Sequence, residues 1–279
     1  MKKKSWIIFG VYSAVFVAAL IVLTPYDFKI TSSLYNPGVW INKTLEVLGP
    51  IFMPFFSIFA CVSLFIQTRL KSKVKQWLVY IGLGFLYIYT IFMGIFTLKY
   101  SYAPYLFVPA IVLYAFFTGF TIFLNLKVVK NENRARFIKL CLVFFIVTMT
   151  SLVVTDIIKI IFSRGRFHEI LAGEVEYRPW YCFTWRFQIN SSFPSGHTTR
   201  AGTSLCFGAL VLYKTRNKIW TLIVEIVAIV FTIGVAISRL FEGMHFAIDI
   251  LTGFYLITIS YFISKTILIN DNEIAAFGI

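Results

Sequence analysis

The sequence predicts an all-α protein: a polytopic membrane helix bundle of about eight transmembrane helices. Hydrophobic residues make up 59% of the 279 residues and charged residues only 14%, whereas a soluble globular chain carries about 25% charged residues. The mean hydropathy is +0.82, and apolar runs of about 20 residues, long enough to span a bilayer, recur along the chain. This composition excludes a water-soluble enzyme, a disordered protein and a collagen-like fibre.

Eight apolar runs are predicted to be membrane helices. The first follows three lysines and has no clear small-x-small cleavage site, which favours a retained helix over a signal peptide. The sixth is short and begins with polar residues, and a tight turn around Tyr100 to Pro104 joins the third and fourth. An amphipathic stretch, 25–47, is expected to lie along the outer surface. The runs are 6–24, 48–67, 76–98, 104–125, 137–161, 198–213, 219–238 and 247–268.

The 26 Lys and Arg residues, against 12 Asp and Glu, have an uneven distribution. With both termini in the cytoplasm, 16 of them fall in cytoplasmic segments, as the positive-inside rule requires. This accounts for most of the net charge of +14 without a nucleic-acid partner. Seven of the other ten cluster on the outer side, where an anion held at the membrane face would explain them: Lys159, Arg164, Arg166, Arg178, Arg186, Arg200 and Arg239.

Three sequence strings carry the residues suited to chemistry on that side. They are KIIFSRGRF (159–167), SSFPSGHTT (191–199) and SRLFEGMHFAID (238–249). On a continuing helix, Lys159 and Arg166 would share a face, and His245 and Asp249, four residues apart, would meet. Guanidinium groups match phosphate oxygens, and a helix start such as that after Ser195 favours anions. The strings therefore indicate phosphoryl transfer. The four cysteines have no metal-binding spacing and are predicted to be packing residues.

Together the strings resemble the type 2 phosphatidic acid phosphatase superfamily, whose pattern is K-x6-RP, PSGH and SR-x5-H-x3-D. The resemblance covers about residues 155–255, and Phe167 replaces the proline of the first motif. It implies a six-helix core preceded here by two further helices. We therefore divide the chain into 1–75, a helical pair with an outer-face segment, and 76–279, the lipid phosphatase core.

The resemblance also implies the roles of eight residues. His245 attacks phosphorus and forms a phosphohistidine, Asp249 orients and charges its imidazole, and His197 protonates the leaving group and then activates water. The phosphoryl oxygens are bound by Lys159, Arg166, Ser195, Gly196 and Arg239. No metal or other cofactor is implied, because the cations neutralise the phosphoryl charge, and vanadate is expected to inhibit.

The predicted function is a lipid phosphatase in a bacterial cytoplasmic membrane, active at the periplasmic or outer face. Candidate substrates are lipid A, undecaprenyl diphosphate, phosphatidylglycerol phosphate and phosphatidic acid. A lipid-to-lipid phosphotransferase of the same fold, and a non-catalytic transporter or lipid-binding protein, are the alternatives. The oligomeric state and the role of Arg164 stay open. Asp156 is favoured to pair with Lys159, and Glu225 is expected to be structural or interfacial, but neither role is fixed. The loop 167–193 is read as either a headgroup-contacting lid or a plain interfacial loop.

Overall fold

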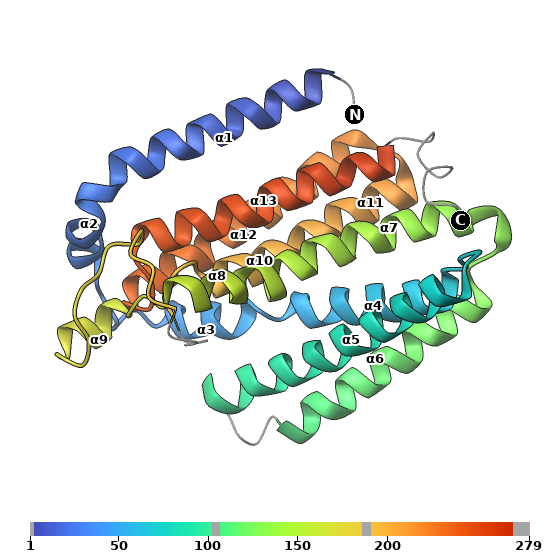
Figure 1. Cartoon of the computed structure of the whole chain (residues 1–279), viewed down its shortest axis with the longest axis horizontal. Coiled ribbons are helices and arrows are strands. Elements are labelled where there is room, and N and C mark those ends of the chain that lie inside the picture. Colours follow the sequence, from blue (N-terminus) through green and yellow to red (C-terminus); the bar gives the residue numbers. More distant parts are fainter. Residues whose placement is uncertain (1–2, 102–106, 186–190, 270–279) are drawn as a thin grey trace. The chain divides into compact units, whose positions relative to one another are not determined.

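The computed structural model describes residues 3–101, 107–185 and 191–269, and all regular structure among them is helical. The predicted all-α class is thereby confirmed. Part of the predicted turn from Tyr100 to Pro104, and Arg186, lie outside these residues. The helices, labelled in Figure 1, are α1 (Lys3–Leu23), η1 (Thr24–Tyr26), α2 (Asp27–Leu34), α3 (Ile41–Leu48), α4 (Phe52–Gln67), α5 (Lys73–Ser101), α6 (Phe107–Lys127), α7 (Asn131–Met149), η3 (Thr150–Val154), α8 (Thr155–Phe162), α9 (Phe167–Leu171), α10 (Gly196–Gly202), η4 (Thr203–Leu205), α11 (Cys206–Thr215), α12 (Lys218–Phe241) and α13 (Ala247–Ile269).

Within these ranges, seven helical segments are long and apolar enough to cross a membrane. They account for all but one of the predicted spans, and the chain is a multi-pass membrane protein. The exception is the predicted run 198–213, which is divided into α10, the 3₁₀ turn η4 and α11. Two hydroxyl groups bond to backbone carbonyls at this point: Thr199 Oγ1 donates to the Gly196 carbonyl at 3.0 Å and Thr203 Oγ1 to the Arg200 carbonyl at 2.6 Å. Such bonds compete with the regular helix pattern.

The chain forms two compact units, each assembled from separate stretches of sequence. One comprises Met1–Pro50, Thr150–Leu205 and Ile226–Ser260, and the other comprises Ile51–Met149, Cys206–Glu225 and Tyr261–Ile279. The predicted boundary at residue 75 stays a prediction.

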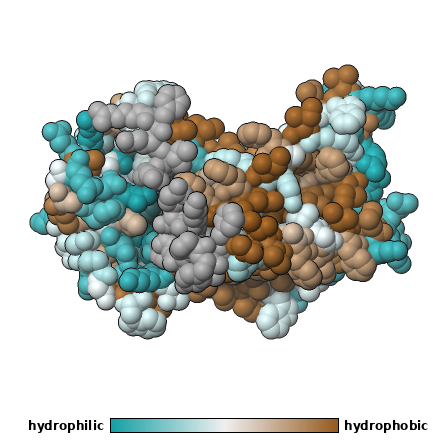
Figure 2. All heavy atoms as spheres, turned by 90° about the horizontal axis from the view of Figure 1, so that it is seen from below, coloured by the Kyte–Doolittle hydropathy of each residue, from teal (hydrophilic) through white to brown (hydrophobic). Residues whose placement is uncertain are grey.

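The unit that begins at Ile51 is built around α4. This helix packs against α5, α6 and α7, which run alongside it in Figure 1. Phe56 and Phe144 meet edge to face at 4.8 Å, and Ser57 and Thr90 share a buried hydrogen bond of 2.7 Å. The opposite face of α5 exposes a row of large apolar side chains at helical spacing, as contact with lipid chains requires: Trp77, Leu78, Ile81, Phe85, Ile88 and Phe92. Hydrophobic side chains cover broad areas of the face drawn in Figure 2.

The unit that begins at Met1 contains all three sequence strings. Helix α1 lies against α13, where Phe16 stacks on Tyr255 at 3.8 Å and Tyr12 shares a hydrogen bond with Thr258 at 2.6 Å. At one end of this unit, α2, α3, α9 and the junction between α12 and α13 gather together (Figure 1). Backbone bonds tie them: Asn36 donates to the Phe241 carbonyl at 2.9 Å. This end holds the candidate site.

Candidate active site

His245 lies in the short connection between α12 and α13 and is buried. Its Nδ1 is 2.6 Å from the Ser192 carbonyl oxygen and 3.8 Å from Asp249 Oδ2. A carbonyl oxygen can only accept a hydrogen bond, so Nδ1 carries the proton. The neutral ring therefore keeps the lone pair on Nε2, the nitrogen that is available for attack.

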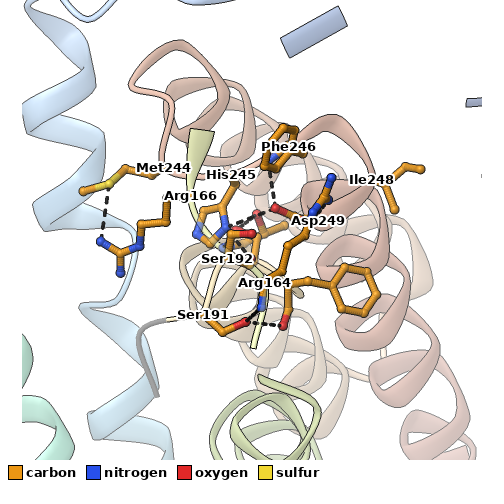
Figure 3. Close-up of polar contacts among 12 residues, drawn as sticks. Arg164, Arg166, Ser191, Ser192, Met244, His245, Phe246, Ile248 and Asp249 are labelled. Atoms are coloured by element: carbon orange, nitrogen blue, oxygen red, sulfur yellow. Dashed lines mark hydrogen bonds and ion pairs between the residues drawn. The ribbon is translucent and has the colours of Figure 1, made fainter. Parts of the chain in front are cut away.

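Asp249, in the first turn of α13, is completely buried and held by three partners. Its Oδ2 accepts from the Phe246 amide at 2.8 Å, its Oδ1 accepts from Arg164 Nη1 at 2.7 Å, and its backbone carbonyl accepts from the Ser195 amide at 2.9 Å. Figure 3 shows Asp249 beside His245 and Arg164. The closest hydrogen-bond partner of the imidazole is thus the Ser192 carbonyl, while Asp249 is placed to act on it by charge.

Ser195 and Gly196 connect the second string to the other two. Ser195 caps α10, because its Oγ accepts from the Thr198 amide at 3.3 Å and from Thr198 Oγ1 at 2.8 Å. Gly196 begins the helix and lies against Lys159, whose Cε would be 3.4 Å from a Cβ added at this glycine. The second string is therefore packed directly on α8 and α13.

His197 follows on α10, and its ring centroid is 6.5 Å from that of His245. Its Nε2 is buried and has no hydrogen-bond partner among the described residues. Burial lowers the pKa of His197 well below its ordinary value of 6.5, and the nearby cations Arg239, Arg200 and Arg166 lower it further. Burial also lowers the pKa of His245 to about 4, although Asp249 acts in the opposite direction. Both imidazoles are therefore neutral at pH 7.

The three cations predicted to bind phosphate have different surroundings. Lys159 Nζ donates to the Ser191 carbonyl. Arg166 Nη1 reaches the Met244 sulfur at 3.6 Å (Figure 3), a weak acceptor, and its buried Nε has no hydrogen-bond partner in the described part of the chain. Arg239 is completely buried. It pairs with Glu46 at 3.0 Å and donates to the Asn42 carbonyl at 2.7 Å. Arg166 therefore has the most donor capacity left for an anion.

One geometric expectation is wrong. Lys159 and Arg166 do not share a helix face, because α8 ends at Phe162 and Ser163 adopts a left-handed conformation with φ of 41°. Arg166 instead lies directly before α9 as its N-cap, where Glu169 Oε2 accepts from its amide at 2.8 Å. The chain turn, rather than helical periodicity, brings both cations into the unit that contains the histidines.

Three residues that pair with the predicted site residues or with one another are not among those predicted from the sequence. The role of Arg164, which is open from the sequence, is to pair with both Asp249 and Asp27 at 2.7 Å. Asp27 and Glu46 come from α2 and α3, which were expected only to line the surface. An acid within a membrane segment needs a compensating partner, so the positions of Asp27 and Glu46 in the sequence were the signal that could have pointed to these pairs. Across the described residues, no three His, Cys, Asp or Glu side chains are grouped to hold a metal ion.

Comparison with known families agrees with these motifs. Residues 139–271 match the model of the PAP2 superfamily. The matched segment covers just under half of the chain. Neither the curated proteins nor the solved structures contain a match. This match agrees with the resemblance to the type 2 phosphatidic acid phosphatases and supports a lipid phosphatase in general terms. The PAP2 segment includes all eight predicted site residues, whereas Asp27 and Glu46 precede it.

Proposed function

We propose that the protein is an integral membrane phosphatase that hydrolyses a lipid phosphate or diphosphate through a phosphohistidine, without a metal ion. The observation that carries the proposal is the state of His245: its Nδ1 is held by the Ser192 carbonyl, which leaves Nε2 as the nucleophile, close to a second histidine. His197 is near enough for both rings to reach one phosphoryl group. Arg166 and Lys159 supply positive charge beside them.

The proposed reaction has two steps. In the first, His245 Nε2 forms a bond to phosphorus, the bond between phosphorus and the lipid oxygen breaks, and His197 gives that oxygen a proton. His197 must be protonated for this step, and the negative phosphoryl group favours its charged form. In the second step, His197 takes a proton from water, the water oxygen bonds to phosphorus, and phosphate leaves as Nε2 regains its lone pair. Arg166, Lys159 and Arg239 stabilise the charge on the phosphoryl oxygens in both steps.

The proposed setting is the outer face of a bacterial cytoplasmic membrane, with both termini inside. This orientation rests on the distribution of the Lys and Arg residues in the sequence. The candidate substrates are lipid A, undecaprenyl diphosphate, phosphatidylglycerol phosphate and phosphatidic acid. This orientation favours lipids displayed on the outer face after transfer across the membrane, and in a Gram-negative cell lipid A and undecaprenyl diphosphate rank above the two glycerolipids.

The test is phosphate release from a panel of these four lipids by the detergent-purified protein. His245→Ala is expected to abolish release, a loss of several orders of magnitude, as for other nucleophile deletions. Brief incubation with a ³²P-labelled lipid should leave an acid-labile, alkali-stable label on the protein, and none on the variant. His168→Gln is the matched control, because His168 bonds the Gly243 carbonyl at 3.2 Å and has no role in the reaction.

Undiminished release by His245→Ala would overturn the mechanism. If the phosphate is recovered on a second lipid instead of in solution, the protein is a phosphotransferase that uses the same intermediate.

A further inference from the structure

Arg164 lies between two buried carboxylates that come from distant parts of the sequence. Its Nη2 pairs with Asp27 Oδ2 and its Nη1 with Asp249 Oδ1, both at 2.7 Å. Asp27 is 1% exposed and Asp249 0% exposed. The guanidinium also lies 3.8 Å from the centroid of the Phe246 ring. Because these three charges are buried, water screens them poorly and their electrostatic interactions with one another are strong.

Arg164 also positions the acceptor of His245 through its backbone. The Arg164 carbonyl accepts from the Ser192 amide at 2.8 Å, and the Arg164 amide donates to Ser191 Oγ at 2.9 Å. The carbonyl of the same Ser192 bonds His245 Nδ1. One residue thus holds both groups that surround Nδ1, the Ser192 carbonyl and the Asp249 carboxylate (Figure 3).

Arg164 neutralises the charge of Asp249, and the second carboxylate, Asp27, offsets the charge of Arg164. A phosphohistidine forms with positive charge developing on the imidazole, and Asp249 is the acid closest to Nδ1, at 3.8 Å. A pair of Asp249 and Arg164 alone would have no net charge and would stabilise this cation poorly. With Asp27 on the other side of the guanidinium, the group of three carries a net charge of −1.

Asp27 is built into the start of α13. Its Oδ1 accepts from the Ile248 amide at 2.9 Å, and Thr31 Oγ1, one turn further along α2, accepts from the Ala247 amide at 3.3 Å. Helix α2 thereby occupies free amides at the start of the helix that carries Asp249. The contact of Asp27 with Arg164 is fixed rather than incidental.

We propose that Asp27 is a positioning residue of the active site, which offsets the positive charge of Arg164 so that Arg164 does not cancel the field of the Asp249 carboxylate at His245. The inference rests on the proposed function. It adds a residue from α2, outside the PAP2 segment, to the catalytic apparatus. Asp27 acts only through Arg164 and Asp249 and contacts no substrate.

The kinetic test compares Asp27→Asn with Thr31→Val. Asp27→Asn removes one charge at nearly constant shape, and we expect kcat to fall about 10-fold, equivalent to about 1.4 kcal/mol of transition-state stabilisation, with KM changed less than twofold. Thr31→Val removes a neutral bond at the same junction and should leave kcat within twofold. Asp27→Glu, which restores the charge, should recover part of the loss. Equal losses in Asp27→Asn and Thr31→Val would mean that α2 serves only as packing, and would overturn the proposal.

A second measurement does not depend on turnover. The chain has only three histidines, so ¹⁵N-histidine NMR in detergent can follow His245 directly, with His168→Gln and His197→Gln for assignment. The charged groups near the His245 ring are Lys159 from α8, Arg166 before α9 and Asp249 from α13, with Arg164 and Asp27 behind Asp249, and the titratable neighbour is His197 from α10.

Loss of the Asp27 charge destabilises the imidazolium, so the midpoint of His245, about 4 in the unaltered protein, should be lower by about one pH unit in Asp27→Asn. The midpoint should not change in Thr31→Val. An unchanged midpoint in Asp27→Asn overturns the inference even if the enzyme is active. If the unaltered protein releases no phosphate from any lipid but the titration midpoint of His245 moves as expected, the proposed function fails and the electrostatic effect of Asp27 on His245 stands.

Discussion

Two clusters of buried charge in this protein differ in how completely their polar atoms are bonded. In the unit that begins at Ile51, Glu225 is 4% exposed, and its Oε1 accepts from Tyr261 Oη at 2.6 Å and from Lys265 Nζ. In the unit that begins at Met1, Arg164 and Arg239 are paired with acids, but Arg166 Nε and His197 Nε2 are buried without a hydrogen-bond partner in the described residues. The polar atoms around Glu225 thus bond one another, a state called closed below, whereas the cluster with Arg166 and His197 has nitrogen atoms left for a ligand.

The comparison shows which property separates a structural cluster from a site. Ionisable residues within membrane helices are functional candidates by default, and both clusters qualify by that rule. Buried polar groups are nearly always bonded, so the exceptions need an explanation. Unsatisfied donors beside two histidines are explained by an anionic substrate. Four substitutions test this distinction between a structural cluster and a site.

Arg164→Met should have the largest effect, on stability. It leaves Asp27 and Asp249 as uncompensated buried carboxylates, which typically costs about 3–5 kcal/mol. Unfolding of the purified protein in detergent measures the change. Arg178→Met, a partly exposed cation in the following loop, should alter stability by less than about 0.5 kcal/mol. Equal stability of the two variants would show that the Arg164 pairs contribute little.

Arg166→Ala should affect activity instead of stability. Among the described residues, the guanidinium bonds only the Met244 sulfur, and weakly, so its loss should change the free energy of unfolding by less than about 1 kcal/mol. Its loss should lower kcat/KM about 100-fold if it stabilises the charge on the phosphoryl group. Activity and unfolding are measured on the same preparation. A destabilised variant that keeps its kcat/KM would place Arg166 with the structural cations.

Gly253→Ala tests the contact that holds the second string against α13. A Cβ added at Gly253 would lie 2.7 Å from the Ser195 carbonyl oxygen, so backbone must move. We expect about 2 kcal/mol of destabilisation and a loss of activity. Gly234→Ala is the matched control, because nothing lies within 4 Å of its added Cβ in α12. Alanine there should stabilise the helix by up to about 1 kcal/mol. An active, stable Gly253→Ala protein would contradict the tight packing.

Glu225→Gln should have the smallest effect. The amide can still accept from Tyr261, and only the charge opposite Lys265 is lost. We expect about 1 kcal/mol of destabilisation, with kcat/KM within twofold of the unaltered protein. A large fall in kcat/KM without destabilisation would show that the closed cluster also takes part in the reaction.

Much of the fold was predictable because membrane helices follow from local composition. Seven of the eight predicted runs correspond to helical segments able to span a membrane. The break within 198–213 was signalled only by the polar residues at the start of that run, two of which bond through their hydroxyl groups to backbone carbonyls there. The end of the predicted run 137–161 lies within one residue of the end of α8 at Phe162. The left-handed conformation of Ser163 was not predictable, since no proline or glycine occupies that position and the surrounding chain sets it.

The membrane class, the three motif strings and the family resemblance follow from the sequence alone, because these depend on residue types and short spacings. Only the tertiary structure decided that the Ser192 carbonyl selects the tautomer of His245, that Arg164 joins Asp249 to Asp27, and that Arg239 is paired with Glu46. These contacts join residues as far as 222 positions apart, such as Asp27 and Asp249 on either side of one guanidinium. The physical reason is that a buried charge needs a nearby partner, and the folded chain, not sequence distance, sets which partner is near.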